Sequence, residues 1–204
     1  MNFSASELVK YSAKKIVYLV RKQIRIKTWM WERGVVYQKK IVEKLGIEAE
    51  EFRGCVTYKG HNIFFCVDGY KDNVFYEIKS FLDEDGNEKE LTEQDMWFYN
   101  QSIVQCAFYK SLLILSESDV LFTPKFRLKE GYEFKTIKFN KNNRFVLLFG
   151  NLMKREVDVL DPNAIFDYYC RKIDAIEELD YDKAKAFDHL FKHKDWDNLK
   201  QYIK

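Results

Sequence analysis

The pattern of hydrophobic and polar residues changes period along the chain and predicts helices at both ends of a central group of strands. Apolar residues recur at helical spacing from Leu8 to Ile24, with lysines and arginines between them, which predicts one long basic amphipathic helix. Ser4 and Glu7 have the spacing of a capping box, which places the start of this helix at Ser4. A second helix is expected to end at Leu45, because Gly46 can adopt the left-handed conformation that terminates helices.

Three antiparallel strands are predicted from about Phe52 onward. Segments 52–58, 61–69 and 73–81 are rich in β-branched and aromatic residues, and the turn-forming stretches Lys-Gly and Lys-Asp-Asn separate them. Further elements are expected in this order: an acidic loop (80–95), a helix capped by Thr92 (96–110), a buried strand (112–115), two more strands (132–139 and 144–149) and terminal helices from Pro162 to Lys204.

This order of elements predicts an α/β domain with an α+β-like arrangement, in which helices flank a central mixed β-sheet. Residues 1–160 would form the core with the basic N-terminal helices, and residues 161–204 would form a C-terminal helical appendage packed on the same domain. The chain has 204 residues, 47% hydrophobic content and only two prolines, so it is long and apolar enough to fold around a sizeable core.

The net charge of +2 conceals an uneven distribution of charge. Between Lys10 and Lys44, eleven lysines and arginines face only two glutamates, which leaves a surplus of nine positive charges in that stretch. A segment of this density suits a polyanion, either nucleic acid or an anionic membrane surface. A solvated helix face balanced by acidic neighbours explains the charge equally well.

The cysteines and histidines do not predict a metal centre. Four cysteines, expected to be reduced and buried, form no CxxC pair and no short spacing with histidine, so neither a zinc site nor an iron–sulfur cluster is indicated. His189 and His193 are four residues apart but have no evident third ligand nearby. The first ten residues lack an apolar leader region and no membrane-span pattern follows, so we expect a cytoplasmic protein, in the host cytoplasm if its origin is viral.

The most informative stretch for chemistry is the second predicted hairpin. If Asp72 and Asn73 form a two-residue turn, Asp68 lies across from Glu77, and Lys79 points to the same face as Glu77. Two opposed carboxylates repel each other unless a cation lies between them, and hard oxygen ligands suit Mg²⁺ or Mn²⁺. The main-chain carbonyl of Ile78 offers a further ligand. A surface ion cluster is the competing interpretation.

Four elements between Gly34 and Tyr109 resemble motifs of one nuclease family. They are Gly34 with Gln38 four residues later, Asp68-Gly69, Glu77-Ile78-Lys79, and Gln105 with Tyr109 four residues later. In this order the elements resemble the PD-(D/E)xK nuclease superfamily, in particular the branch that contains lambda exonuclease, YqaJ-type phage exonucleases and the RecB nuclease domain. The resemblance implies a restriction-endonuclease-like core with an active site where two strands diverge and the QxxxY helix packed across it.

The resemblance also implies residue roles. Asp68 and Glu77 would bind the metal, Lys79 would be the catalytic lysine, and Gln105 and Tyr109 would contact the DNA backbone or orient the lysine. Gln38 stands where the family more often has glutamate or histidine, so the number of metal ions stays open. Relatives with an iron–sulfur cluster carry flanking cysteines, which this chain lacks.

The function expected from these features is hydrolysis of DNA phosphodiester bonds by metal-activated water, as an exonuclease or a single-strand-active nuclease in recombination, repair or replication. The alternative is a catalytically inactive nuclease-fold subunit that binds DNA or serves in assembly. Single-stranded DNA or the ends of duplex DNA are the expected partners, and no membrane partner is expected. The helices after Pro162 would form the interface of any homo-oligomer. Trp29 and Trp31 are candidates for base stacking, and core aromatics are an equally open interpretation. The residues expected to hold DNA are Lys14, Lys15, Arg21, Lys22, Arg25, Lys39 and Tyr109.

Overall fold

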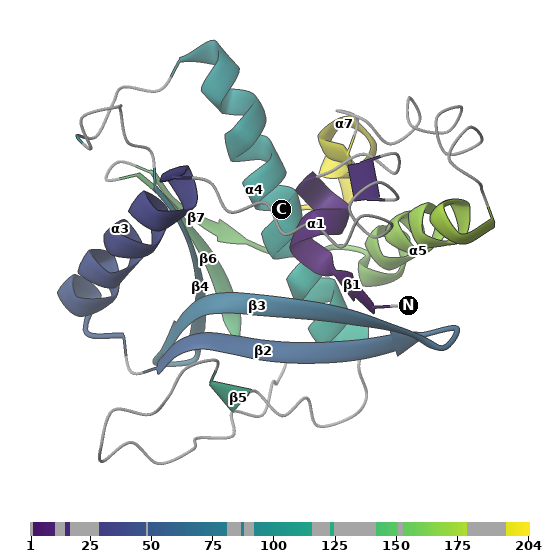
Figure 1. The fold of residues 1–204 in the computed structure, drawn as a ribbon, viewed down its shortest axis with the longest axis horizontal. Helices are drawn as coiled ribbons and strands as arrows, with labels where there is room; N and C mark the ends of the chain where they lie inside the picture. The colour runs from purple at the N-terminus through teal and green to yellow at the C-terminus, as the bar shows by residue number, and fades with distance from the viewer. Residues whose placement is uncertain are drawn as a thin grey trace.

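A mixed β-sheet with helices on both faces forms the body of the molecule in the computed structural model (Figure 1). The structure describes residues 2–10, 15–16, 29–47, 49–80, 87, 92–115, 123–124, 142–150, 153–178 and 195–204. Within these residues the strands are β1 (Asn2–Ser4), β2 (Ala49–Tyr58), β3 (His61–Lys71), β4 (Val74–Lys79), β5 (Thr123–Pro124), β6 (Arg144–Phe149) and β7 (Met153–Val157). The helices are α1 (Ala5–Lys10), α3 (Trp29–Leu45), α4 (Glu93–Leu115), α5 (Pro162–Glu178) and α7 (Asp195–Leu199), followed by the short 3₁₀ helix η1 (Lys200–Tyr202).

The strand order is β5-β2-β3-β4-β6-β7, with β1 added to β3. Strands β2, β3 and β4 form the predicted antiparallel meander. Its two turns contain Lys59-Gly60 and Asp72-Asn73, and all four residues have positive φ angles between 45° and 78°. Two consecutive residues of positive φ give the turn whose twist matches that of a hairpin, so the register of both hairpins follows from these residues.

Strand β4 pairs in parallel with β6, which makes the sheet mixed. Parallel neighbours need a crossover connection, and α4 lies within the chain segment that joins them. Helix α4 begins with the predicted cap: the backbone N–H and the hydroxyl of Thr92 both donate to Oδ2 of Asp95, each at 2.7 Å. From Gln101 to Leu113 every residue of α4 is buried, so this helix forms the centre of the core.

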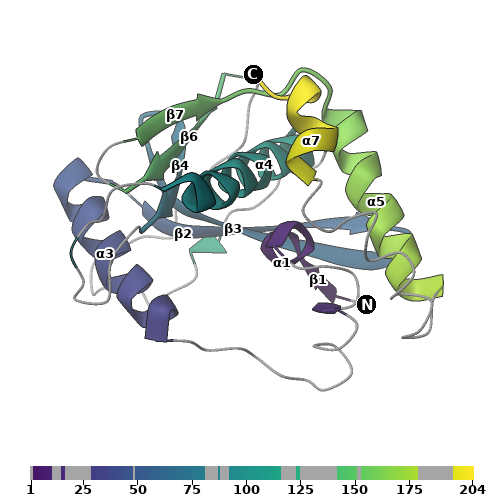
Figure 2. The same cartoon turned by 90° about the horizontal axis from the view of Figure 1, so that it is seen from above.

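Helix α3 covers the other face of β4, and both views show β4 between α3 and α4 (Figures 1 and 2). Tyr37, Val42 and Ile47 form a small hydrophobic cluster with Ile78, while Phe75 joins the main core with α4. Because side chains alternate along a strand, Ile78 and Phe75 point to opposite faces of the sheet. Glu77 and Lys79 therefore share the face of Phe75, toward α4.

The end of α3 confirms the prediction of a glycine stop. Gly46 has φ of +58°, its N–H donates to the carbonyl of Glu43, and the N–H of Ile47 donates to the carbonyl of Val42. This pair of hydrogen bonds is the Schellman motif, which satisfies the last carbonyls of a helix. The ammonium of Lys71 donates to the Leu45 carbonyl at 2.9 Å and fastens this end of the helix to β3.

The C-terminal helix α5 lies beside α4 and begins at Pro162, as predicted (Figure 2). Its residues Ile165 and Ile173 belong to the same core as Leu8 of α1. The buried ammonium of Lys172 donates to the Leu8 carbonyl at 2.5 Å, which joins the C-terminal helix to the N-terminal one. The segment after 160 thus contributes to the core of the sheet domain.

Several sequence predictions need correction. The expected buried strand at 112–115 is the last turn of α4. Leu112 and Leu113 are buried, as predicted, but a short apolar run has the same composition in a buried helix as in a buried strand. Cys55 is exposed and Cys66 half-buried, because side chains alternate between the two faces of a strand: Cys66 stands between the buried Phe65 and Val67, and Cys55 pairs with the exposed Phe64. Cys106 and Cys170 are buried, and all four are free thiols.

The predicted basic helix is described only in part, and its described residues, 5–10 and 15–16, are helical. Residues 2–4 form strand β1, which pairs in parallel with β3, and α1 extends from Ala5 to Lys10. Leu8 and Ile16 are buried, in agreement with the apolar stripe. The remainder of the predicted basic helix, apart from residues 15–16, and the expected strand at 132–139 lie outside the described residues.

Candidate active site

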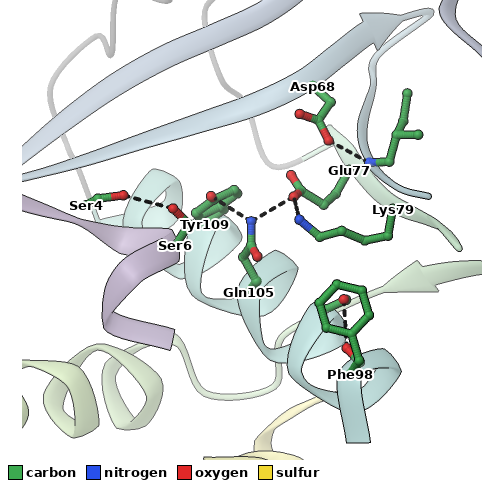
Figure 3. Close-up of polar contacts among 10 residues, drawn as sticks. Ser4, Ser6, Asp68, Glu77, Lys79, Phe98, Gln105 and Tyr109 are labelled. Atoms are coloured by element: carbon green, nitrogen blue, oxygen red, sulfur yellow. Dashed lines mark hydrogen bonds and ion pairs between the residues drawn. The ribbon is translucent and has the colours of Figure 1, made fainter. Parts of the chain in front are cut away.

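Strands β3 and β4 separate at Asp68. Their ladder contains Lys71 with Val74, Tyr70 with Phe75, and Gly69 with Tyr76, as the turn register predicts. The next interaction is of a different kind, because the N–H of Ile78 donates to carboxylate Oδ2 of Asp68 at 2.7 Å (Figure 3). The expected direct pairing of Asp68 with Glu77 is thus replaced by a side-chain cap on the β4 backbone.

The separation of the strands follows from the way β3 shares its edges. Strand β2 pairs along one edge of β3, so β1 and β4 must both use the other edge. β1 occupies positions 62–64 and β4 occupies positions 69–71, which leaves residues 65–68 between the two partners. Asp68 is the last residue of this interval and lies next to the start of the β4 ladder.

A chain of hydrogen bonds connects β4 to α4 beside this opening (Figure 3). The Lys79 ammonium donates to Oε1 of Glu77 at 2.5 Å, and Nε2 of Gln105 donates to the same oxygen at 2.7 Å. The second N–H of Gln105 donates to the hydroxyl of Tyr109 at 2.8 Å. Four of the residues that the family motifs singled out therefore form one connected group.

Glu77 is the buried centre of this group. Its side chain is 2% exposed, and Oε1 accepts the hydrogen bonds from Lys79 and Gln105, while Oε2 has no hydrogen-bond partner in the described part of the chain. A buried carboxylate oxygen without a partner is costly, because the charge has lost its water without replacement. Such an oxygen is suited to bind a cation.

The electrostatics keep Lys79 charged. Burial is the largest influence and opposes the charge, but attraction to Glu77 and then to Asp68 outweighs it, so the pKa of Lys79 lies above its ordinary value. Burial, with the charge of Glu77 as the second cause, raises the pKa of Cys106 and of Tyr109 well above their ordinary values. At neutral pH this site therefore contains an ammonium ion, a neutral thiol and a neutral phenol.

Lys10, at the end of α1, adds a second positive charge near Lys79. Partial burial lowers the pKa of Lys10, the charge of Lys79 lowers it further, and Glu7 opposes both. Helix α1 packs on α4 and on β3, which brings its end to this side of the sheet. Sequence reasoning placed Lys10 only at the start of a basic segment, because the packing of α1 against α4 has no local pattern.

Gln38 and Ile78 relate to the site less directly. Gln38 is half-buried on α3, whose buried residues pack on the opposite face of β4 from Glu77. Gly34, one turn earlier, approaches the end of β4 closely: a Cβ atom there would lie 3.5 Å from Oγ of Ser80. The side chain of Ile78 belongs to the small cluster with α3, and its N–H binds Asp68. The ligand roles of the Gln38 side chain and the Ile78 carbonyl stay predictions.

The residues predicted to hold DNA are only partly described. Lys39 is exposed on α3, and Lys15 is half-buried in a helical segment. Four others, together with the histidine pair, lie outside the described residues: Lys14, Arg21, Lys22, Arg25, His189 and His193. The backbones of Trp29 and Trp31 are helical, and their stacking role stays a prediction.

Searches against protein-family models, curated proteins and solved structures find no match to this chain. The case for a function therefore rests on the residues and their geometry. No group of three or more histidine, cysteine, aspartate or glutamate side chains in the described ranges is arranged to hold a metal ion. Among the helices of those ranges, none has the length and apolar character needed to cross a membrane.

Proposed function

We propose that this protein is a metal-dependent deoxyribonuclease that hydrolyses phosphodiester bonds. The observation that carries the proposal is the buried Glu77–Lys79 ion pair beside the Asp68 carboxylate, which accepts from the neighbouring Ile78 N–H, at the point where β3 and β4 separate. An ordinary surface ion cluster would be solvated, whereas Glu77 is 2% exposed and linked to a buried helix through Gln105. Burial of a carboxylate at this cost is typical of functional sites.

The donor set suits Mg²⁺ or Mn²⁺. Hard divalent cations prefer carboxylate and carbonyl oxygens, and Oε2 of Glu77 is a buried carboxylate oxygen that lacks a hydrogen-bond partner among the described residues. Asp68, Glu77 and the Ile78 carbonyl would hold the cation, with Gln38 as a further candidate. When bound, the cation supplies Lewis-acid stabilisation of negative charge on the phosphate.

Lys79 acts in this proposal as a fixed positive charge. Its raised pKa keeps it protonated at neutral pH, which suits stabilisation of a transition state that carries extra negative charge and does not suit proton abstraction. Glu77 orients the ammonium through the 2.5 Å contact. The Gln105 amide binds the Glu77 carboxylate and the Tyr109 hydroxyl, so these two α4 residues fix the position of the Glu77 carboxylate.

DNA is the proposed polyanion because positive charge is concentrated on the elements before Leu45. Lys10 lies electrostatically close to Lys79, and Lys39 and Lys40 are exposed on α3. Charged contacts to phosphates predict binding that weakens as salt concentration rises. Single strands and duplex ends are the proposed substrates, and the helices after Pro162 are the proposed interface of any homo-oligomer.

Cleavage of end-labelled single- and double-stranded DNA, with Mg²⁺ or Mn²⁺ and with closed circular DNA in parallel, tests the proposal. The wild type should cleave linear DNA in the presence of either cation, and Glu77→Ala and Lys79→Ala should abolish cleavage. Cutting of closed circles would identify an endonuclease. Salt-sensitive DNA binding by the wild type without cleavage under any of these conditions would reject the enzyme and favour the alternative, a nuclease-fold subunit that binds DNA without turnover.

A further inference from the structure

Gln101 on α4 carries a second buried oxygen without a partner. The residue is 6% exposed, and Oε1 forms no hydrogen bond among the described residues, a condition that it shares with Oε2 of Glu77. An unsatisfied amide oxygen in a core lowers stability, so its presence calls for a compensating role. The family motif includes Gln105 and Tyr109 and assigns nothing to Gln101.

The helical period places Gln101 on the face that looks toward the site. Successive α-helical residues are rotated by about 100°, so residues four apart differ by about 40°. Gln101 and Tyr109 therefore lie on either side of Gln105 along one stripe, and Gln105 binds Glu77 directly.

The contacts of neighbouring residues place Gln101 at the level of Lys79. Lys79 is the register partner of Phe149 in β6, and the ring of Phe149 contacts the rings of Phe98 and Tyr99, with centroids 5.6 and 5.2 Å apart. Going from Glu77 to Lys79 covers about 6.6 Å along β4, and going from Gln105 back to Gln101 covers about 6 Å along α4. The two steps run in the same direction.

We propose that Gln101 is a positioning residue for Lys79, whose ammonium donates a hydrogen bond to Oε1 of Gln101 when a divalent cation engages the Glu77 carboxylate. This inference deepens the proposed function and rests on it. In the structure the ammonium and the Gln105 amide share Oε1 of Glu77. A cation draws on the same negative charge, so Lys79 then needs another acceptor.

A neutral amide is suited to that role. It accepts a hydrogen bond from the ammonium without cancelling its charge, so the charge remains available to the phosphate. A carboxylate in the same place would form an ion pair with Lys79 and compete with the substrate. The proposal thus explains why a buried glutamine with an unsatisfied oxygen stands here.

The first measurement is the melting temperature without and with Ca²⁺. In this test Ca²⁺ fills the proposed oxygen site and does not support cleavage. Gln101→Met removes the oxygen with little change in shape, and the cation-free variant should melt at the same temperature as wild type or higher. The rise on adding Ca²⁺ should be smaller than that of wild type by about 2–4 °C, because the hydrogen bond forms only in the loaded protein. In a Lys79→Met background, Gln101→Met should leave that rise unchanged.

The second measurement is single-turnover cleavage with DNA affinity in Ca²⁺ measured alongside. Gln101→Met should lower the cleavage rate at least ten-fold and change DNA affinity less than two-fold. Ser111→Ala, which removes a buried polar group of α4 that donates to the Ala107 carbonyl, is the matched control and should alter neither.

Two results would overturn the inference and leave the nuclease intact. One is a lower melting temperature for Gln101→Met without cation; the other is cleavage by Gln101→Met at the wild-type rate, together with the same rise in melting temperature on adding Ca²⁺ as in wild type. Failure of the wild type to cleave DNA, with the Ca²⁺ response as expected, would instead reject the proposed function.

Discussion

The side-chain amide of Gln105 donates a 2.7 Å hydrogen bond to Oε1 of Glu77, and this contact joins the central helix α4 to strand β4. The same oxygen accepts the ammonium of Lys79 at 2.5 Å. The position of the charged pair therefore depends on a buried helix as well as on the hairpin that carries it. Perturbation of α4 should reach the site through this bond.

Gln105→Leu should lower the cleavage rate about 10–100-fold with little loss of DNA affinity, because a carboxylate displaced by even an ångström misplaces both the cation and Lys79. Single-turnover rates and affinities in Ca²⁺ measure the two effects separately. Ser102→Ala removes a hydroxyl that binds the Phe98 carbonyl on the same helix and serves as the control. An unchanged cleavage rate in Gln105→Leu would show that this hydrogen bond has no part in catalysis.

Gly54→Ala should destabilise the fold by about 1–3 kcal/mol, because overfilled cores force side chains out of place. A Cβ at position 54 would lie 2.1 Å from Cζ of Phe65, and the Phe65 ring packs on Tyr109. Urea denaturation measures the free energy of unfolding. Gly60→Ala provides the comparison: no atom lies within 4 Å of its Cβ position, so it should cost only the strain of a positive φ, about 1 kcal/mol. Equal losses of unfolding free energy in Gly54→Ala and Gly60→Ala would contradict the close approach at Gly54.

The ion pair between Lys110 and Asp158 should make stability depend on pH. The Lys110 ammonium donates to Oδ1 of Asp158 at 2.8 Å, and this hydrogen bond lowers the pKa of Asp158 below its ordinary value. A lowered pKa contributes stability that is present above the unfolded pKa of about 3.9 and is lost as pH falls through the folded pKa.

Asp158→Asn should therefore be less stable than wild type at pH 7, by roughly 0.5–1 kcal/mol since the carboxylate is half-exposed, and equally stable near pH 2. Denaturant titrations at the two pH values measure the difference. A constant difference at both values would contradict the assignment to the carboxylate charge.

Lys10→Gln should weaken DNA binding and lower the slope of the logarithm of affinity against the logarithm of salt concentration by about 1, because one phosphate contact is lost. Binding in Ca²⁺ measures the slope without cleavage. Lys200→Gln, at the C-terminal end of the chain and beside Asp197, is the matched charge removal and should leave the slope unchanged. The same slope in wild type and Lys10→Gln would exclude Lys10 from the DNA contact.

Local turn chemistry explains why much of the hairpin site was predictable. Asp72 and Asn73 tolerate positive φ, so the register of β3 and β4 followed from the sequence, and with it the shared face of Glu77 and Lys79. The hydrogen bond from Ile78 to Asp68 was not predictable, because the strands separate there under the influence of β1, which pairs with β3 from 60 positions away.

The remaining misses have a common cause. The run at 112–115 belongs to a helix because α4 is buried on nearly all sides, and that burial removes the amphipathic period that identifies helices. Gln101 was overlooked because a glutamine in a helix is ordinary until its surroundings show that its oxygen has no partner. Both depend on tertiary packing, which local patterns do not encode.

The most direct test of the central claim is single-turnover cleavage of labelled linear DNA by Glu77→Gln in Mg²⁺, with DNA affinity measured in Ca²⁺. This substitution keeps the shape of the side chain and its Oε1 acceptor but removes the negative charge. The account predicts that cleavage falls by at least a thousand-fold, the scale of losing a metal-dependent step, and that the melting temperature without cation falls, because Lys79 loses the carboxylate that balances its charge. Cleavage by Glu77→Gln at the wild-type rate would contradict the claim that this carboxylate is the centre of a metal-dependent nuclease site.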